Sequence, residues 1–382
     1  MSARLLIIQP KAFAYRRTFY TDLRDHLGGY GVDLEVVVGH SDGPREDAYD
    51  ADYVHLVPDR LSVWTSDRLR WRSPSKSVRA AGEADLVLIE QAVKNLDGYA
   101  WLLGQRKRRR SVAMWGHGRT FSTHQGPALA RGKQFLTRRC DWFFAYTDVG
   151  ADFVVAHGFP RSRVTVVGNT LDVEAGQRHR DTVTVAQSRA FRDEQRLTEG
   201  RTALFLGGVD ADKDIEYLLR AALAAERALP GFTLLVAGAG EDLWRVLDLQ
   251  AAGGPVRALG RVDDAEKALV MSVSDVMMIP TWIGLVAVES FVGGVPIVTR
   301  YDQHHSPEAD YLVPGVDSVW LPRDTDAQGF AAGVVALLKD SQTRERLCAQ
   351  CSARADDFAM AGMVDRFCSG VLAWDEIRRF GL

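Results

Sequence analysis

Long hydrophobic runs are missing from this sequence of 382 residues: no stretch approaches the roughly 18 apolar residues that cross a bilayer. Cysteine is scarce as well, since Cys140, Cys348, Cys351 and Cys368 are too few and too scattered for a secreted disulfide framework. Residues 1–10 enter an apolar, strand-like run without the charged leader and small-residue cleavage site of a signal peptide. These absences predict a cytosolic protein.

The composition that remains is that of a globular protein. Hydrophobic residues make up 46% and charged residues 25%, which argues against a mostly disordered chain or a coiled coil. One basic stretch stands out, because Gly98 to Cys140 contains ten basic residues and no acidic one. Such a stretch attracts anions: a phosphorylated substrate, an acidic glycan or an anionic membrane face. A sequence pI of about 6.3 and the lack of a nucleic-acid-binding motif argue against nucleic acid.

Short β-rich runs alternate with helix-length amphipathic segments along the whole chain, which predicts parallel sheets built from βαβ units. The first series of strands is expected at 4–9, 34–38, 86–89, 111–115, 142–145 and 164–167. A second series is expected at 202–206, 233–237, 276–279 and 295–298, with helices between the strands. The fold class is therefore α/β, with two Rossmann-like, doubly wound parallel-sheet domains facing across a cleft.

The apolar rhythm fades after Asp172 into a polar stretch that ends at Gly200. We therefore expect an N-terminal domain over 1–172, a linker over 173–200 and a C-terminal domain over 201–357. The last segment, 358–382, is again helical and is expected to pack back on the N-terminal domain. Ligands would bind at the carboxyl ends of both sheets.

The segment Pro280 to Val298 combines a strand end, a helix start and a carboxylate. A helix that opens near Gly284 directs the free N–H groups of its first turn toward the carboxyl edge, where they favour a phosphate. Glu289 lies about a turn and a half into that helix. It fits two interpretations, a carboxylate that accepts hydrogen bonds from ribose hydroxyls or a member of a structural ion pair.

The other candidate loop follows the strand at 202–206 and contains Gly207, Gly208 and, five residues later, Lys213. Two glycines let the backbone approach a ligand, and the lysine reaches over a diphosphate as a point charge. The alternative is a tight turn with a solvated lysine. In the first half, His117 stands between two glycines, and it fits either a ligand contact or a buried histidine bonded to backbone.

In this order the motifs resemble the retaining glycosyltransferases of family four, which have the GT-B fold. The residues that carry the resemblance are Gly207 with Lys213, Gly238-Ala-Gly240, Gly284 to Glu289 with Gly293-Gly-Val-Pro296, His305-Ser-Pro-Glu308, Glu90-Gln91, Trp115-Gly-His117-Gly and Gly168-Asn169-Thr-Leu-Asp172. The Trp-Gly-His-Gly motif is similar to one branch of that family.

The resemblance implies transfer of a sugar from a nucleotide-diphosphate donor, with a UDP-sugar favoured, without a cofactor and without a metal. It implies that Glu289 holds the ribose, that Lys213 neutralises the diphosphate and that His117 touches the donor sugar. The residues expected to bind the donor are Gly207, Gly208, Lys213, Gly238, Gly240, Thr281, Gly284, Leu285, Val286 and Glu289. Those expected to bind the acceptor are Tyr15, Arg16, Arg17, Glu90, His117 and Arg119.

Two positions depart from the family pattern. Thr281 stands where a glutamate usually reads hydroxyls of the transferred sugar, and Gly208 where an arginine usually assists the lysine. Losing a charge-assisted phosphate contact costs roughly 1.5–3 kcal/mol unless another cation replaces it. Arg119, Arg16 or Arg17 could be that cation. The departures indicate either an altered donor or lost activity.

Several alternatives stay open. Asp210, Asp212 and Asp214 mimic an Asp-x-Asp metal motif, but no further ligands complete a shell in sequence. The acceptor is expected to be a small molecule, a glycan or a lipid-linked intermediate, and the basic first half predicts peripheral contact with the inner face of a membrane. The alternative functions are a catalytically idle GT-B homologue that binds a nucleotide sugar or a partner enzyme, and a GT-B sugar epimerase or phosphorylase.

Overall fold

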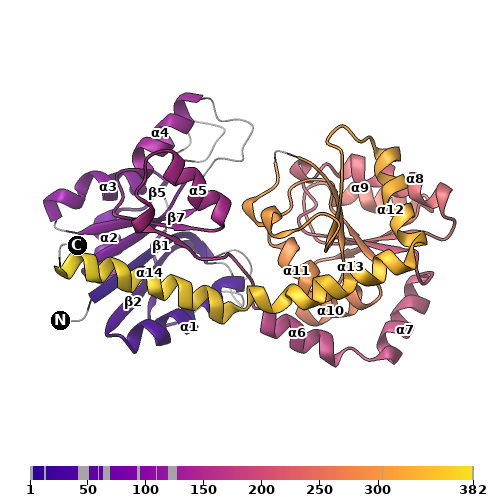
Figure 1. Cartoon of the computed structure of the whole chain (residues 1–382), viewed down its shortest axis with the longest axis horizontal. Helices are drawn as coiled ribbons and strands as arrows, with labels where there is room; N and C mark the ends of the chain where they lie inside the picture. The colour runs from indigo at the N-terminus through magenta and orange to yellow at the C-terminus, as the bar shows by residue number, and fades with distance from the viewer. Residues whose placement is uncertain are drawn as a thin grey trace. The chain divides into compact units, whose positions relative to one another are not determined.

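The computed structural model describes residues 3–12, 14–41, 51–58, 60–62, 69–92, 95–108, 110–118, 127–302 and 304–380. The chain divides into two compact units: unit 1 contains residues 1–169 and 360–382, and unit 2 contains residues 170–359. Figure 1 shows each unit as a sheet with helices packed on it.

Unit 1 is built on a seven-stranded sheet in the order β3-β2-β1-β6-β7-β8-β9, with every pairing parallel. These strands are β1 (Ala3–Ala12), β2 (Val32–Ser41), β3 (Val54–Leu56), β6 (Leu86–Glu90), β7 (Ser111–Gly116), β8 (Trp142–Ala145) and β9 (Val164–Val166). A separate antiparallel pair is β4 (Arg60–Ser62) and β5 (Leu69–Trp71). The helices are α1 (Arg17–Gly28), α2 (Pro74–Ala81), α3 (Leu96–Arg108), α4 (Pro127–Thr137), α5 (Asp148–Ala156) and α14 (Met360–Phe380), with short 3-10 turns η1 (Ala14–Arg16) and η3 (Arg161–Arg163).

Both faces of this sheet are covered, as a run of consecutive apolar residues in a strand requires. In β1, Leu5 and Ile7 pack into one apolar cluster, whereas Leu6 and Ile8 pack into another on the opposite face. The first cluster includes residues of α1 and α14, and Figure 1 shows α14 beside α1. The end of the chain therefore completes the core of unit 1.

Unit 2 has a six-stranded parallel sheet in the order β12-β11-β10-β13-β14-β15. The strands are β10 (Thr202–Leu206), β11 (Thr233–Ala237), β12 (Val256–Gly260), β13 (Val276–Met278), β14 (Ile297–Arg300) and β15 (Ser318–Leu321). The helices are α6 (Val173–Thr182), α7 (Val185–Gln195), α8 (Ile215–Ala228), α9 (Leu243–Ala251), α10 (Asp264–Ser272), α11 (Val286–Gly293), α12 (Ala327–Lys339) and α13 (Ser341–Arg354), with 3-10 turns η4 (Ala211–Lys213), η5 (Pro307–Tyr311) and η6 (Ala355–Phe358).

The segment expected as a linker over 173–200 is largely helical and belongs to unit 2. Asp172 caps α6 by accepting a hydrogen bond from the backbone N–H of Ala175, and Thr184 with Gln187 forms a capping box at the start of α7. α6 packs on α10 and α11. The polar sequence is the solvent side of two surface helices, which explains why it lacks an apolar rhythm.

Candidate functional site

The carboxyl edge of the unit 2 sheet contains a topological switch point. From β10 the chain proceeds to β11 and β12 on one side, and later to β13 on the other side of β10. The loops that follow β10 and β13 leave the edge in opposite directions, and open α/β sheets bind ligands in the crevice between such loops. Gly207 follows β10, and Thr281 comes three residues after β13. The donor loops predicted from sequence therefore meet at this place.

The glycines of these loops are explained by the close approach of two loops to each other. A Cβ on Gly238 would overlap the carbonyl oxygen of Gly207, and one on Gly240 would overlap that of Val209. The backbone N–H of Gly207 donates to Ala237, at 3.0 Å, and that of Val209 to Ala239, at 3.1 Å. Packing of the loops after β10 and β11 therefore requires the glycines whether or not a ligand is bound.

Asp210 occupies the space beside Gly208, the position at which the family pattern usually has an arginine. A Cβ on Gly208 would lie 2.8 Å from Asp210 Oδ2, and Asp210 Oδ1 accepts a hydrogen bond of 3.0 Å from the backbone N–H of Glu241. A long side chain at position 208 would have to displace this carboxylate. Among the cations considered as replacements, Arg119 lies outside the described residues.

Lys213 joins the loop after β10 to the loop after β13. Its Nζ donates a hydrogen bond of 2.9 Å to the carbonyl oxygen of Trp282 and lies 5.8 Å from the centroid of the indole ring. Burial lowers the pKa of Lys213, although the nearby carboxylates of Asp212 and Asp210 oppose the change. A half-buried ammonium at a switch point is well placed to meet a negatively charged ligand.

The loop from Pro280 to Gly284 is held in an unusual conformation. Trp282 has a φ of 52°, in the left-handed region that large side chains rarely adopt. The next backbone N–H, that of Ile283, donates to His305 Nδ1 at 3.0 Å, and His305 Nε2 in turn donates to the carbonyl oxygen of Arg300 at 2.9 Å. The buried imidazole therefore fixes the loop, with its proton on Nε2.

This loop leads directly into α11. The N-cap residue of this helix, Leu285, makes no side-chain capping hydrogen bond, and the amides of Gly284, Leu285 and Val286 lie at its start. Those amides and the helix dipole favour a phosphate group. The ammonium of Lys213 and the positively polarised start of α11 are thus linked through Trp282, whose carbonyl oxygen accepts from Lys213 and whose loop leads into the helix.

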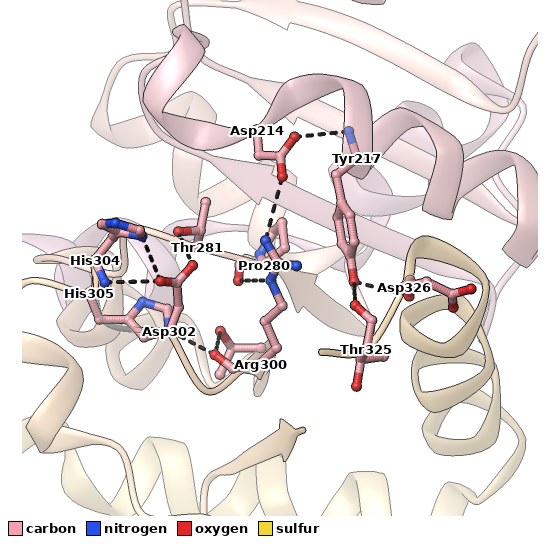
Figure 2. Close-up of polar contacts among 11 residues, drawn as sticks. Asp214, Tyr217, Pro280, Thr281, Arg300, Asp302, His304, His305, Thr325 and Asp326 are labelled. Atoms are coloured by element: carbon pink, nitrogen blue, oxygen red, sulfur yellow. Dashed lines mark hydrogen bonds and ion pairs between the residues drawn. The ribbon is translucent and has the colours of Figure 1, made fainter. Parts of the chain in front are cut away.

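A compact set of polar side chains lies beside Trp282. Figure 2 shows Asp302 between Thr281 and His304. Thr281 Oγ1 donates to Asp302 Oδ2 at 2.8 Å, and Asp302 Oδ1 accepts from the backbone N–H of His304 at 3.0 Å and lies 2.7 Å from His304 Nδ1. The imidazole of His304 stacks on the indole of Trp282, with the ring centroids 6.2 Å apart. Asp302 and Trp282 are site candidates that the sequence analysis missed.

Arg300 is a structural link in the same close-up (Figure 2). Its Nε donates to the carbonyl oxygen of Pro280 at 3.3 Å, one terminal nitrogen lies 3.5 Å from Asp214 Oδ2, and the guanidinium lies 4.3 Å from the ring centroid of Tyr217. Asp214 also caps α8 through the backbone N–H of Tyr217. Asp210 and Asp214 therefore have separate partners, and no three His, Cys, Asp or Glu side chains of the described residues gather as metal ligands would.

Glu289 forms the structural ion pair that was one of its two interpretations. Its Oε1 accepts a hydrogen bond of 2.7 Å from Lys267 Nζ, which also binds Asp264 at 2.9 Å. Burial raises the pKa of Glu289, and the charge of Lys267 offsets part of the rise. The pair lines a pocket of about 330 Å³ together with Gly176 and Arg180 of α6. No described contact joins Glu289 to Lys213, so its role toward ribose stays a prediction.

In unit 1, His117 follows β7 and is largely buried. Its ring packs edge-on against Tyr146, with the centroids 4.5 Å apart. Burial lowers its pKa to about 3, helped by the positive charges of Lys133 and Arg16. A Cβ on Gly116 would lie 2.6 Å from Gln91 Cβ, and one on Gly118 would overlap the carbonyl oxygen of Gly150. The glycines that flank His117 thus make room for protein atoms and do not indicate a ligand space.

Arg16, another residue expected to bind the acceptor, is buried and bonded to other groups of the protein. It donates to Asn169 Oδ1 at 2.7 Å, and its guanidinium lies 4.5 Å from the ring centroid of Trp115. Arg16 as one of the possible cations that assist Lys213 stays a prediction. Tyr15 and Arg17 are exposed on η1 and at the start of α1.

Glu90 lines a pocket of about 280 Å³ at the carboxyl ends of β6 and β7. Asn95 donates to its Oε2 at 3.0 Å. Lys133 lines the same pocket, and burial lowers the pKa of its ammonium to about 8, with Glu90 opposing the change. Apolar side chains complete the pocket: Ile89, Leu102, Met114 and Leu136. Unit 1 thus presents a largely apolar site with one acidic and one basic group.

Comparison with known proteins identifies part of unit 2. Residues 200–340 match the family model described as Glycosyl transferases group 1. This stretch is therefore similar to the group 1 glycosyltransferases. A phosphatidyl-myo-inositol mannosyltransferase of Mycolicibacterium smegmatis is 35% identical over 162 residues, which are 41% of this chain and 41% of that protein. The chain therefore aligns with about two fifths of the length of this curated relative.

Solved structures extend the similarity of fold beyond residues 200–340. The crystal structure of Anabaena Alr3699/HepE in complex with UDP has a TM-score of 0.70 at 16% identity and covers 98% of this chain and 100% of its own. The UDP-GlcNAc 2-epimerase of Neisseria meningitidis, bound to UDP-GlcNAc, has a TM-score of 0.65 at 14% identity, with 97% and 99% covered. The predicted GT-B fold class, with two parallel-sheet α/β domains, is confirmed. Assignment to a branch with the motif at 115–118 stays a prediction.

Proposed function

We propose that this protein is a retaining glycosyltransferase that moves a sugar from a nucleotide-diphosphate donor, with a UDP-sugar favoured, to an acceptor hydroxyl without a metal. The match of residues 200–340 to the group 1 glycosyltransferases supports transfer of a glycosyl group. The retaining outcome and the UDP-sugar come from the resemblance of the motifs at 207–213 and 280–296, and the UDP complex of the Anabaena neighbour fits the choice of nucleotide.

The observation that carries the proposal is the pairing of Lys213 with the start of α11 at the switch point. The hydrogen bond from Lys213 to Trp282 places the ammonium on the loop that ends at Gly284. As the bond from the sugar to the diphosphate breaks, negative charge grows on the leaving oxygen. A fixed ammonium and the amides at the helix start stabilise that charge without reorganising, which lowers the barrier.

The acceptor is assigned to unit 1. The apolar pocket that contains Glu90 and Lys133 suits a hydroxylated acceptor with an apolar part. The mannosyltransferase relative is named for a lipid, phosphatidyl-myo-inositol, so a lipid-linked acceptor is included in the proposal. None of the helices in the described ranges is long and apolar enough to cross a membrane. We propose peripheral contact with the inner face of a membrane through the basic first half of the chain.

Thermal unfolding with a panel of nucleoside diphosphates and nucleotide sugars tests the donor site. A ligand present at 100 times its Kd adds about 2.7 kcal/mol of stability to the protein. Lys213→Ala is expected to abolish most of the stabilisation by UDP, because the diphosphate loses the positive charge that binds it. Glu289→Ala is expected to abolish most of it too, because the ribose loses the carboxylate that accepts its hydroxyl groups. Lys339→Ala, an exposed lysine of unit 2, is the control and keeps the stabilisation. Unchanged stabilisation in both test variants would place the donor elsewhere.

Turnover then separates the proposed function from its alternatives. A transferase releases the nucleoside diphosphate only when an acceptor is present, whereas an idle homologue binds the donor and releases nothing. An epimerase alters the sugar without an acceptor. The anomeric proton coupling of the product, measured by NMR, decides whether the configuration is retained.

A further inference from the structure

We propose that Asp302 and His304, in the loop after β14, form with Thr281 and Trp282 the subsite that recognises hydroxyl groups of the transferred sugar. This inference rests on the proposed function, since it assigns the glycosyl half of the same donor. It adds Trp282, Asp302 and His304 to Thr281, which the sequence analysis already expected at the donor. The four side chains come from two loops that follow adjacent strands, β13 and β14.

Position is the first argument. Trp282 contacts both parts of the site: its carbonyl oxygen accepts from Lys213 and its ring stacks on His304. The polar set around Asp302 therefore lies beside the group proposed to bind the diphosphate. In a nucleotide-diphosphate sugar the glycosyl group is bonded directly to the distal phosphate, so side chains beside the diphosphate site are within reach of the sugar.

The hydrogen-bonding capacity of Asp302 is the second argument. An ionised carboxylate has about four acceptor positions, and the described donors, Thr281 Oγ1 and the two nitrogens of His304, occupy three. Counting donors of the described residues alone, one acceptor position on Oδ2 is left for a hydroxyl. Hydrogen bonds from Thr281 and His304 lower the pKa of Asp302 against the opposing effect of burial, so the group is an anion at neutral pH.

The neighbours of Asp302 also have the chemistry that binds a sugar. His304 Nδ1 faces Asp302, so the Nε2 edge of the ring is directed away from the carboxylate. The indole of Trp282 is an apolar group of the kind that packs on the C–H groups of a pyranose ring, and it stacks on the imidazole of His304. This tryptophan is held at a φ of 52°, and residues in such a strained conformation cluster at ligand sites. A carboxylate, an imidazole and an indole together match a polyhydroxylated ring.

The test compares sugar nucleotides with the matching diphosphates. For the wild type and for Asp302→Asn, the Kd values of UDP, UDP-glucose, UDP-galactose, GDP and GDP-mannose are measured by calorimetry. The quantity of interest is the ratio of Kd for the diphosphate to Kd for the sugar nucleotide. We expect Asp302→Asn to lower that ratio at least tenfold for the preferred sugar while changing the Kd of the diphosphate less than threefold. Asp324→Asn, an exposed carboxylate of the same unit, is the matched control and leaves the ratio unchanged.

Thr281 provides a second variant that preserves shape. Thr281→Val removes the hydroxyl that donates to Asp302, whereas Thr281→Ser retains it. We expect the valine variant to lower the ratio and the serine variant to restore it, which a loss of packing alone would not produce. Unfolding curves without ligand identify any variant that fails to fold.

The outcomes separate the two proposals. If no diphosphate binds the wild type, the proposed function is overturned and the inference with it. If diphosphates bind normally and Asp302→Asn leaves the ratio unchanged, or lowers the affinity for diphosphate and sugar nucleotide by the same factor, the inference alone is overturned.

Discussion

Burial controls the protonation of the basic side chains near the carboxyl ends of both sheets. The pKa of Lys213 in unit 2 is lowered, and so are those of Lys133 and His117 in unit 1, in each case because the folded protein removes water from the charged form. For the lysines this leaves a cation that a phosphate stabilises further. For His117, with a pKa of about 3, it leaves a neutral imidazole at every pH where the protein is expected to work.

The neutral state of His117 has a consequence for stability in acid. The unfolded chain binds a proton at this position below about pH 6.5 while the folded state does not, so the free energy of unfolding falls as the pH drops below 6.5. Between pH 6.5 and 5 the loss is at most about 2 kcal/mol, at 1.36 kcal/mol for each pKa unit. We expect His117→Gln to remove this part of the acid dependence, as measured by urea unfolding at pH 7 and pH 5.

An exposed histidine provides the comparison. His157→Gln at the end of α5 removes an exposed imidazole and is measured alongside His117→Gln at both pH values. If His117→Gln loses as much stability between pH 7 and 5 as the wild type does, the imidazole of His117 is protonated in the folded protein.

At the scale of the element, the loops after β10 and β11 act as one unit because their backbones are packed against each other. Gly238→Ala places a methyl group on the carbonyl oxygen of Gly207, and neither backbone can yield without breaking a strand-end hydrogen bond. We expect a loss of at least about 3 kcal/mol in the free energy of unfolding of unit 2, the upper part of the range for overpacking, with loss of UDP binding. Gly28→Ala, which meets no atom within 4 Å, is the control for the substitution itself.

Calorimetry measures the stability of unit 2 and the affinity for UDP, and together these distinguish a packing effect of Gly238→Ala from a direct effect on the ligand. If Gly238→Ala weakens UDP binding without lowering the stability of unit 2, the glycine serves the ligand and the loop packing is incidental.

Most elements were predictable because their sequence pattern is strong. The strands at β1, β6, β10 and β11 are short, continuous apolar runs, and each was predicted close to its observed place. β12 and β15 were missed because Arg257 and Ser318 interrupt their apolar character. α7 was predictable in retrospect, since Thr184 and Gln187 have the spacing of a capping box.

The candidate site was predictable only in part. Lys213 and the start of α11 could be placed together because both follow parallel strands, whose carboxyl ends meet at one edge of a sheet. The Lys267 partner of Glu289 and the Asp302 partner of Thr281 are 22 and 21 residues away in the chain. Side-chain pairing between elements depends on packing, which no local sequence pattern shows. For this reason Asp302 was missed, and the ion pair of Glu289 stayed one of two interpretations.

At the scale of the whole molecule, α14 fills the core of the first unit. Phe367 stacks on Phe144, with centroids 4.4 Å apart and planes at 14°, and meets Phe19 and Trp115 edge-on. Gly370 lies so close to the sheet that a Cβ would be 2.6 Å from the ring of Phe144. Arg366 donates to the carbonyl oxygen of Val167 at 2.9 Å. These contacts make the helix an integral part of unit 1.

Two compact units predict two unfolding transitions, which substitutions and ligands should move separately. Phe367→Ala is expected to destabilise unit 1 by about 3–5 kcal/mol, the cost of emptying a buried aromatic site, and to leave the transition of unit 2 in place. UDP is expected to raise only the transition of unit 2. Differential scanning calorimetry measures both shifts.

Phe380→Ala, at the exposed end of the same helix, is the control and should leave unit 1 nearly unchanged. A single transition that moves with both the substitution and the nucleotide would show that the units unfold together.

The return of α14 also orders events during synthesis. Residues 170–359 are contiguous and can mature as soon as they leave the ribosome, whereas the first unit lacks the aromatic ring of Phe367 until α14 has been synthesised. At about 5–20 residues per second, the interval between completing residue 169 and reaching 360 is roughly 10–40 s. During that time the nascent amino-terminal half exposes the apolar face that α14 later covers, and it is then the part of the polypeptide that most needs a chaperone.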